Sequence, residues 1–301
     1  MKRLLIVFNP RSSRFSDVKK EVLNRYDDFK GYIVGKYEVK PTNLKDNIKS
    51  LSKILEDGDL VISAGGDATG IIASSSILNS KKDARLAILP YGNFNDFSRT
   101  LKTATLDDAL NGKTITYYPL EVYVNDKFWR YATCYVTIGM TAAAVSIYNK
   151  PKMRQKLKKS IGRKIGSYTQ LILWYFKNRK KQNYLPEFKL NGKLVSAKNS
   201  DYAAVNSHFM ARVMKGGEDY KNPKVFHSEI ERTTNFYYLF KLMAKSILTR
   251  IPGSETKEDI LEFTNPAKVT VQTEGESELL ENVKTIKIKK SSQSLKVITK
   301  D

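Results

Sequence analysis

The stretch Ser63-Ala64-Gly65-Gly66-Asp67-Ala68-Thr69-Gly70 decides the fold that we expect for the first third of this chain. It follows the apolar run Leu60-Val61-Ile62 and precedes an apolar segment, residues 71–78, that suits a helix. Gly-Gly lets the backbone approach a ligand closely because neither residue carries a Cβ atom. The N–H groups at the start of the next helix suit a phosphate, and Asp67 can hold Mg²⁺ or accept a proton. The pattern fits a phosphate-binding turn, and on its own it fits a capped loop without a ligand equally well.

Apolar strands alternate with helical patterns around this turn. The expected strands are residues 4–8, 32–37, 59–63 and 85–89, and the expected helices are residues 16–26, 44–55 and 71–78. Strands that are apolar on both faces and separated by helices predict a parallel sheet covered on both sides. Ligands bind such sheets at the carboxyl ends of the strands. Polar and glycine-rich loops, residues 9–13, 65–67 and 90–97, follow three of these ends.

The pattern changes near Thr116, after which alternating runs and turn signals such as Asn191-Gly192 predict antiparallel strands. The expected runs are residues 121–124, 128–138, 187–190, 202–206, 269–273, 285–288 and 295–298, with helical insertions at 154–181 and 236–250. The sequence therefore predicts an α/β N-terminal domain, residues 1–118, and a C-terminal β-sandwich with helical insertions, residues 119–301. It leaves open whether the last strands return to the first domain.

Composition describes a basic, globular protein. The chain has 301 residues, of which 41% are hydrophobic, and a formal charge of +21. The sequence predicts no membrane span. The apolar run at residues 4–8 ends at Asn9-Pro10-Arg11, which is typical of a buried strand rather than of a signal peptide. The single cysteine, Cys134, excludes an intramolecular disulfide and fits a reducing cytoplasm. The charge implies a polyanionic partner, which can be nucleic acid, an anionic membrane or a phosphorylated substrate.

The segment 150–181 is dense in Lys and Arg and has no acidic residue. Its apolar residues recur at steps of three or four, as in an amphipathic helix: Leu157, Ile161, Ile165, Tyr168, Leu171 and Tyr175. Such a helix can lie on an anionic bilayer, or it can pack on the protein and turn its basic face to water. We found no motif that reads RNA or DNA, no metal cluster and no Ser-His-Asp arrangement, and we expected His208 and His227 to be structural.

Four motifs follow one another in the order of a known family. They are Asn9-Pro10-Arg11-Ser12-Ser13, Gly65-Gly66-Asp67-Ala68-Thr69, Pro90-Tyr91-Gly92-Asn93-Phe94-Asn95-Asp96-Phe97 and Glu274-Gly275-Glu276. With them the chain resembles the diacylglycerol kinase catalytic-domain family, which includes bacterial lipid kinases and sphingosine kinases and is akin to NAD kinases. The resemblance implies that an N-terminal domain binds ATP and Mg²⁺ and that a C-terminal β-sandwich carries the lipid.

The resemblance also implies a role for each matching residue. The nucleotide-binding set is Asn9, Ser12, Ser13, Gly65, Gly66, Asp67, Thr69, Gly92, Asn95 and Asp96. The magnesium set is Asp67, Asp96 and Glu276, and the catalytic set is Asp67, Glu274 and Glu276, with Glu274 as the candidate general base. The chain departs from the family pattern at several positions, among them Ser13, Ala68, Asn93 and Glu274, so the sequence leaves open whether it is active.

The sequence thus predicts a cytoplasmic lipid kinase that associates with the inner face of the membrane. We expect it to phosphorylate a lipid hydroxyl, with diacylglycerol as the favoured substrate. Residues 150–181 would meet the anionic surface. One alternative is an impaired relative that binds nucleotides or anionic lipids. NAD kinase is a weaker alternative, because the Asn95-Asp96-Phe97 loop and the basic insertion argue against it. The identity of the lipid and a homodimer both stay open.

Overall fold

A computed structural model describes residues 2–92, 95–103, 105–148, 185–195, 199–210, 214–216, 223–231, 241, 244–245 and 247–300. The basic segment 150–181, most of the predicted helical segment 236–250, and Asn93 lie outside the described residues.

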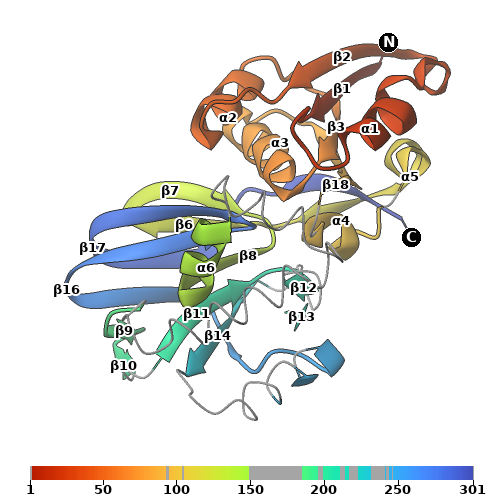
Figure 1. Ribbon diagram of the computed structural model, residues 1–301. Helices are drawn as coiled ribbons and strands as arrows, with labels where there is room; N and C mark the ends of the chain where they lie inside the picture. The colour runs from red at the N-terminus through yellow and green to blue at the C-terminus, as the bar shows by residue number, and fades with distance from the viewer. Residues whose placement is uncertain are drawn as a thin grey trace.

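Six strands of the described chain form the N-terminal sheet (Figure 1). They are β1 (Lys2–Phe8), β2 (Tyr32–Glu38), β3 (Leu60–Gly65), β4 (Arg85–Pro90), β5 (Lys113–Tyr117) and β18 (Leu295–Thr299), in the order β2-β1-β3-β4-β18-β5. Strands β1 to β4 are parallel to one another, β18 is parallel to β4, and β5 is antiparallel to β18. The predicted parallel sheet is confirmed, and a strand from the end of the chain lies within it.

Helices cover both faces of this sheet, as expected for strands that are apolar on both sides. They are α1 (Phe15–Val18), a π-helical turn (Lys19–Leu23), a 3-10 turn (Tyr26–Phe29), α2 (Leu44–Ser52), α3 (Asp67–Ser80), α4 (Asp96–Thr100) and α5 (Leu106–Asn111). Leu51 and Ile72, from α2 and α3, join one buried cluster, whereas Val18 and Leu106 join another on the opposite face. The Asn43 side chain starts α2 by accepting a hydrogen bond of 2.8 Å from the Asp46 N–H.

The C-terminal part is an antiparallel sheet, so this part of the fold prediction is also confirmed. Its strands are β6 (Leu120–Val124), β7 (Lys127–Ala132), β8 (Tyr135–Gly139), β9 (Phe188–Leu190), β10 (Lys193–Val195), β11 (Asn199–Val205), β14 (Val225–Glu231), β15 (Ser254–Thr256), β16 (Glu258–Thr273) and β17 (Glu276–Lys290). A separate pair is formed by β12 (Phe209–Met210) and β13 (Met214–Lys215), and α6 (Met140–Tyr148) follows β8. Side chains as far apart in the sheet as Val122, Tyr202 and Val225 pack into one core, so the sheet curls around that core.

The single strand predicted for residues 128–138 is wrong, because the chain breaks it at Thr133 and Cys134. Strand β7 pairs with β6, whereas β8 pairs with β11 and β16. The chain must leave one ladder and enter another, which frees the two residues between them from strand pairing. This break lies at the functional site described below.

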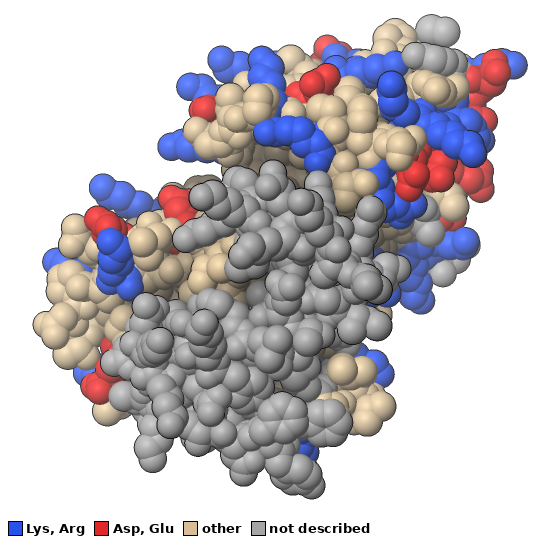
Figure 2. All heavy atoms as spheres, viewed as in Figure 1, with Lys and Arg blue, Asp and Glu red and all other residues tan. Residues whose placement is uncertain are grey.

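The two sheets pack directly against each other. Phe97 and Tyr117, whose ring centroids are 5.0 Å apart, share a buried cluster with Tyr135 and Val205 of the second sheet. The chain crosses between the sheets after β5 and again between β17 and β18 (Figure 1). In the part of the chain that the structure describes, no helix is long and apolar enough to cross a membrane. Lys and Arg side chains are spread over the N-terminal part (Figure 2), where exposed lysines include Lys19, Lys20, Lys30, Lys36 and Lys40.

Candidate functional site

The turn between β3 and α3 is tight because two glycines allow it. A Cβ atom on Gly65 would lie 2.3 Å from the Thr69 hydroxyl oxygen, so a larger residue would push helix and strand apart. The Thr69 N–H closes the turn by donating to the Gly66 carbonyl over 2.9 Å. Ala68, which replaces a family glycine, is the second residue of α3 and has no need of a left-handed backbone there. This departure therefore leaves the turn intact.

The loop after β4 lies directly against this turn. The Asn95 side chain bridges the loop, since its Oδ1 accepts from the Gly92 N–H at 2.7 Å and its Nδ2 donates to the Gly92 carbonyl at 3.0 Å. Asn95 itself has a left-handed φ of 57°, which asparagine tolerates better than most residues. A Cβ on Gly92 would come within 2.5 Å of the Gly66 Cα atom, so only glycine allows this approach.

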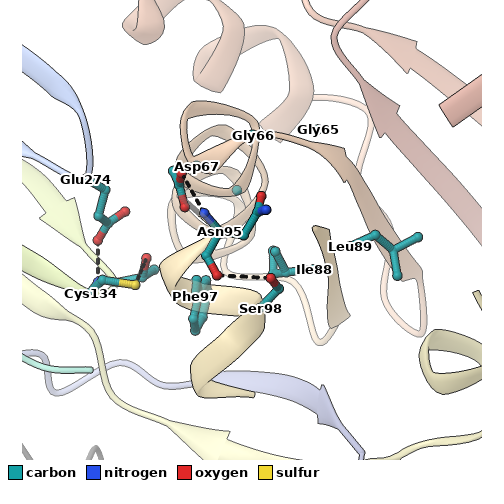
Figure 3. Close-up of a pocket in the computed structure, with 12 residues that line it drawn as sticks. Gly65, Gly66, Asp67, Ile88, Leu89, Asn95, Phe97, Ser98, Cys134 and Glu274 are labelled. Atoms are coloured by element: carbon teal, nitrogen blue, oxygen red, sulfur yellow. Dashed lines mark hydrogen bonds between the residues drawn. The ribbon is translucent and has the colours of Figure 1, made fainter. Parts of the chain in front are cut away.

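Asp67 connects the two loops. One carboxylate oxygen accepts from the Asn95 N–H (Figure 3) and the other from the Asp96 N–H, each over 3.1 Å. Burial raises the pKa of the Asp67 carboxyl, while these two N–H groups act in the opposite direction by stabilising the charged form. The aspartate of the Gly-Gly-Asp motif thus holds the start of α4 in place.

Glu274 enters the same region from the second sheet, at the turn between β16 and β17. Its φ of 50° is left-handed, and its side chain is only 5% exposed. One carboxylate oxygen accepts a hydrogen bond from the Cys134 N–H (Figure 3). Burial raises the pKa of Glu274 to about 8; hydrogen bonds from Cys134 and Thr133 oppose this rise, and the charge of Asp67 adds to it. The site therefore contains a carboxyl group that titrates near neutral pH.

Both carboxylates line one pocket between the sheets (Figure 3). Its walls combine the phosphate-turn residues, an apolar floor and the strand break: Gly65, Gly66, Asp67, Gly70, Ile88, Leu89, Asn95, Phe97, Ser98, Thr133, Cys134 and Glu274. Of the residues singled out from the sequence, the pocket brings together Gly65, Gly66, Asp67, Asn95 and Glu274.

The other residues of the nucleotide-binding, magnesium and catalytic sets do not line this pocket: Asn9, Ser12, Ser13, Thr69, Gly92, Asp96 and Glu276. Asn9 shapes the loop after β1, because its Oδ1 accepts from the Arg11 N–H and its carbonyl from the Ser12 N–H, both at 3.0 Å. The Ser12 hydroxyl oxygen is buried and has no hydrogen-bond partner among the described residues. Ser13 follows in this loop and is exposed.

Asp96, Thr69 and Glu276 complete the set. Asp96 is buried and accepts a hydrogen bond of 3.2 Å from the Tyr135 hydroxyl, which ties α4 to the second sheet. Thr69 is 1% exposed and packs under Gly65, so it supports the turn from below. Glu276 begins β17, two residues beyond Glu274.

Sequence reasoning missed Thr133, Cys134 and Arg130. The first two were expected inside a regular strand, and only the break between two ladders makes their N–H groups available to Glu274. The Arg130 guanidinium lies 3.6 Å from the centre of the Trp129 ring. Burial lowers the pKa of Arg130, whereas the negative charges of Glu278, Glu276 and Glu274 raise it. In the sequence, Arg130 stands out only through its aromatic neighbours Trp129 and Tyr131. An alternating strand pattern does not by itself indicate a function for such a residue.

A Ser-His-Asp arrangement, which the sequence did not suggest, is present in the second sheet. The Ser254 hydroxyl lies 2.9 Å from His227 Nε2, and His227 Nδ1 lies 3.0 Å from Asp259 Oδ2. Asp259 also accepts hydrogen bonds from the hydroxyls of Tyr202 and Thr256. Ser254 and His227 lie on the paired strands β15 and β14, and Asp259 lies on β16, three strands beyond β14 in the sheet order, so the group ties the edge strand β15 to the rest of the sheet.

Asp67 is the pocket carboxylate that fits a magnesium ion arriving with a nucleotide. Among the described residues, no three His, Cys, Asp or Glu side chains are grouped so that they could hold a metal by themselves. Mg²⁺ in phosphoryl-transfer sites needs only one or two carboxylates, and phosphate and water supply its other ligands. Asp67 meets this requirement, because each of its oxygens accepts one N–H and keeps a lone pair.

Comparison with known proteins agrees with this geometry. A family model, the diacylglycerol kinase catalytic domain, matches residues 3–116. No curated protein matches the chain. The fold is similar to a crystal structure of a diacylglycerol kinase from Bacillus anthracis, with a TM-score of 0.68 and 16% identity over 99% of this chain and 97% of that one. A second structure from the same organism has 17% identity and the same TM-score and coverage. The resemblance seen in the motifs is therefore confirmed for residues 3–116, which match the model of the diacylglycerol kinase catalytic domain.

Proposed function

We propose that the protein is an ATP-dependent lipid kinase that transfers the γ-phosphate to a lipid hydroxyl, with diacylglycerol as the acceptor and phosphatidic acid as the product. One observation carries this proposal: Asp67 from the first sheet and Glu274 from the second line the same pocket. Phosphoryl transfer needs neutralised phosphate charge, in-line positioning and an acceptor for the hydroxyl proton. A pocket built from both sheets can supply all three and exclude water.

The loops of the first sheet suit the nucleotide. Gly66 directly precedes the helix α3, whose first N–H groups favour an anion. The loop 9–13, with the buried Ser12 hydroxyl, would contact the phosphates from the neighbouring strand end. Magnesium, when bound, would neutralise phosphate charge; Asp67 would hold it, and Asp96 and Glu276 would support its water shell.

Glu274 is the residue that we assign as general base. A base works best when its pKa lies near the working pH, and the pKa of Glu274 is raised to about 8. Its carboxylate accepts hydrogen bonds from Cys134 and Thr133, and a remaining lone pair would take the proton of the lipid hydroxyl. Glutamate in place of the family's aspartate carries the carboxylate one methylene further into the pocket.

The lipid would be met at an anionic membrane surface on the cytoplasmic side. The formal charge of +21 and the exposed lysines of the N-terminal part favour such a surface. The predicted amphipathic segment 150–181 would add a second contact.

One incubation separates the candidate functions. The protein is mixed with labelled ATP, Mg²⁺, NAD and vesicles that contain diacylglycerol and anionic phospholipid. We expect label in phosphatidic acid. Label in NADP would instead identify an NAD kinase, and salt-sensitive vesicle binding without any labelled product would identify a binding protein.

The same assay tests the site. Asp67→Asn removes the charge on which Mg²⁺ depends and one of two acceptors for the α4 N–H groups, so lipid labelling should be abolished. Asp83→Asn, which removes an exposed carboxylate that pairs with Lys296, is the matched control and should keep full activity. Full activity of the Asp67 variant would sink the assignment.

A further inference from the structure

A buried asparagine lies behind the pocket, at the junction of the two sheets. Asn206 follows β11 and is 4% exposed. Its Nδ2 lies 2.9 Å from the Tyr118 carbonyl, 3.0 Å from the Thr133 carbonyl and 3.2 Å from the Tyr117 hydroxyl. Its Oδ1 accepts a hydrogen bond from Lys290 Nζ. One carboxamide thus contacts four other residues from three separate parts of the chain.

These partners mark the places where the chain passes between the sheets. Tyr117 ends β5, and Tyr118 lies on the first crossing. Lys290 ends β17, directly before the second crossing. Thr133 belongs to the break between β7 and β8. Asn206 therefore links both connections to the strand break that lines the pocket.

The dipeptide Thr133–Cys134 is held from two sides. On the pocket side, its hydrogen bonds stabilise the Glu274 carboxylate. On the opposite side, the Cys134 carbonyl accepts from the Asn206 N–H over 2.7 Å, and the Thr133 carbonyl accepts from Asn206 Nδ2. Both carbonyls of the dipeptide thus accept hydrogen bonds from the same residue, and the N–H of Cys134 points the other way, to Glu274.

We propose that Asn206 is a positioning residue: it fixes the Thr133–Cys134 dipeptide and through it the place of Glu274 in the pocket. It does not touch a substrate. Its effect comes from the geometry of one peptide group, and displacements of about 1 Å at a reacting group cost orders of magnitude in rate. The kinetic part of this inference rests on the proposed kinase function, whereas the positional part does not.

The only cysteine of the chain makes the positional part measurable without any enzymatic activity. Cys134 is 1% exposed, so iodoacetamide reaches it only when this dipeptide opens. Asn206→Ala removes the carboxamide donor of the Thr133 carbonyl, which then keeps only the Tyr117 hydroxyl, at 2.6 Å, among the donors of the described residues. We expect alkylation of the native full-length protein to become at least about tenfold faster, since a lost buried hydrogen bond is worth roughly that factor.

Asn125→Ala is the matched control. Asn125 also joins two chain segments, because its Oδ1 accepts from the Lys284 N–H at 2.7 Å and its Nδ2 donates to the Asn282 carbonyl at 3.0 Å, but it is not part of the pocket. This variant should leave the alkylation rate unchanged. Repeating the measurement in low urea separates local from global opening, because local opening depends little on denaturant. An Asn206→Ala rate equal to that of the control, or one that rises only through global unfolding, overturns the proposal.

Kinetics test whether Asn206 acts through Glu274. In Asn206→Ala we expect kcat for lipid phosphorylation to fall about 10- to 100-fold while KM for ATP changes by less than about twofold. In a Glu274→Gln background the same change should have no further effect on kcat, whereas a purely structural role gives independent, multiplying losses. Losses in kcat that multiply in the double variant therefore refute positioning through Glu274.

A second variant covers the case in which the alanine variant does not fold. Asn206→Asp keeps the shape and an acceptor for Lys290 but removes the Nδ2 donor, so it should reproduce both the faster alkylation and the lower kcat. If the unmodified protein yields no ATP-dependent product, the proposed function fails, and the alkylation experiment still decides whether Asn206 holds the dipeptide.

Discussion

The two carboxylates of the pocket are held in different ways. Asp67 accepts hydrogen bonds from two N–H groups only 28 and 29 positions away, both in a loop of its own sheet. Glu274 depends on the Cys134 N–H, 140 positions away, at a break between two ladders. One half of the site is therefore set by local loop pairing, and the other half forms only when the strands of the second sheet assemble correctly.

Their electrostatics differ as well. Burial raises the pKa of both groups, and hydrogen bonds oppose the rise in both, from Asn95 and Asp96 at Asp67 and from Cys134 and Thr133 at Glu274; the negative charge of Asp67 raises the pKa of Glu274 further. The pKa of Glu274 reaches about 8. In the proposed kinase the two carboxylates would divide the roles: Asp67 would be the structural and charge-holding group, and Glu274 would exchange a proton.

We expect the largest effect from a substitution of Glu274, which tests this division of roles. Glu274→Gln keeps the size of the side chain and an acceptor for the Cys134 N–H but cannot take up the hydroxyl proton. Because general-base catalysis contributes about 10²- to 10⁴-fold, kcat for lipid phosphorylation should fall by that factor. The control is Glu281→Gln, which removes an exposed carboxylate that pairs with Lys268. Activity within threefold of the unmodified protein would show that Glu274 is not the base.

The second effect is a pH dependence of stability. A folded-state pKa of about 8, against 4.5 for a free glutamate, means that the folded protein binds this proton more tightly than the unfolded chain. The stabilising contribution is therefore complete below about pH 4.5 and is lost as the pH rises to about 8. Its full size is on the order of 5 kcal/mol, since each pKa unit corresponds to roughly 1.4 kcal/mol.

Urea unfolding at several pH values measures this contribution, with Glu274→Gln as the reference. The free energy of unfolding of the unmodified protein should decline relative to the variant between pH 5 and pH 8. Asp67 titrates in both proteins, so its contribution largely cancels in the difference. Two curves that run in parallel would contradict the raised pKa.

The third effect tests the local half of the site by adding one methyl group. In Gly92→Ala the new Cβ would lie 2.5 Å from the Gly66 Cα and 2.9 Å from Asn95 Oδ1, so the two loops must separate. Overpacking of this kind costs about 1–3 kcal/mol of stability. In Gly70→Ala the new Cβ meets only Ile88 at 3.7 Å, within a helix, so stability should be unchanged or higher by up to about 1 kcal/mol. Thermal unfolding of both variants checks the contrast, and equal melting temperatures would show that the loops are not in close contact.

The difference between the two halves also explains what the sequence could predict. Gly65, Gly66, Asp67 and Asn95 line the pocket and are recognisable because their spacing along the chain is set by one turn and one loop. The parallel sheet follows from strands that are apolar on both faces. Both features are local, so a motif or a periodicity is enough to find them.

The remaining features depend on contacts that no local pattern records. Thr133 and Cys134 resemble part of a strand until β8 pairs with β11 and β16 instead of continuing beside β6. Glu274 has a left-handed backbone that its side chain gives no reason to expect. The role of Asn206 appears only when both crossings between the sheets are in place.

We expect the smallest effect from a test of whether the Asp67 half of the site also depends on the second sheet. The Tyr135 hydroxyl of β8, in the second sheet, donates over 3.2 Å to Asp96, the first residue of the helix α4 of the N-terminal part. The matched hydroxyl of Tyr123 donates to Glu121 over 2.7 Å within one sheet. Replacing either tyrosine by phenylalanine removes one hydrogen bond to a carboxylate and should cost about 1–2 kcal/mol of stability.

Catalysis should distinguish these two tyrosine variants even where their stabilities agree. Tyr135→Phe frees α4 from the second sheet, and α4 begins with the N–H groups that hold Asp67, so kcat should fall about three- to tenfold. Tyr123→Phe changes no contact of the pocket and should keep kcat. Equal kcat values for both variants would mean that Asp67 is held by its own loop alone and that the second sheet contributes to the site only through Glu274.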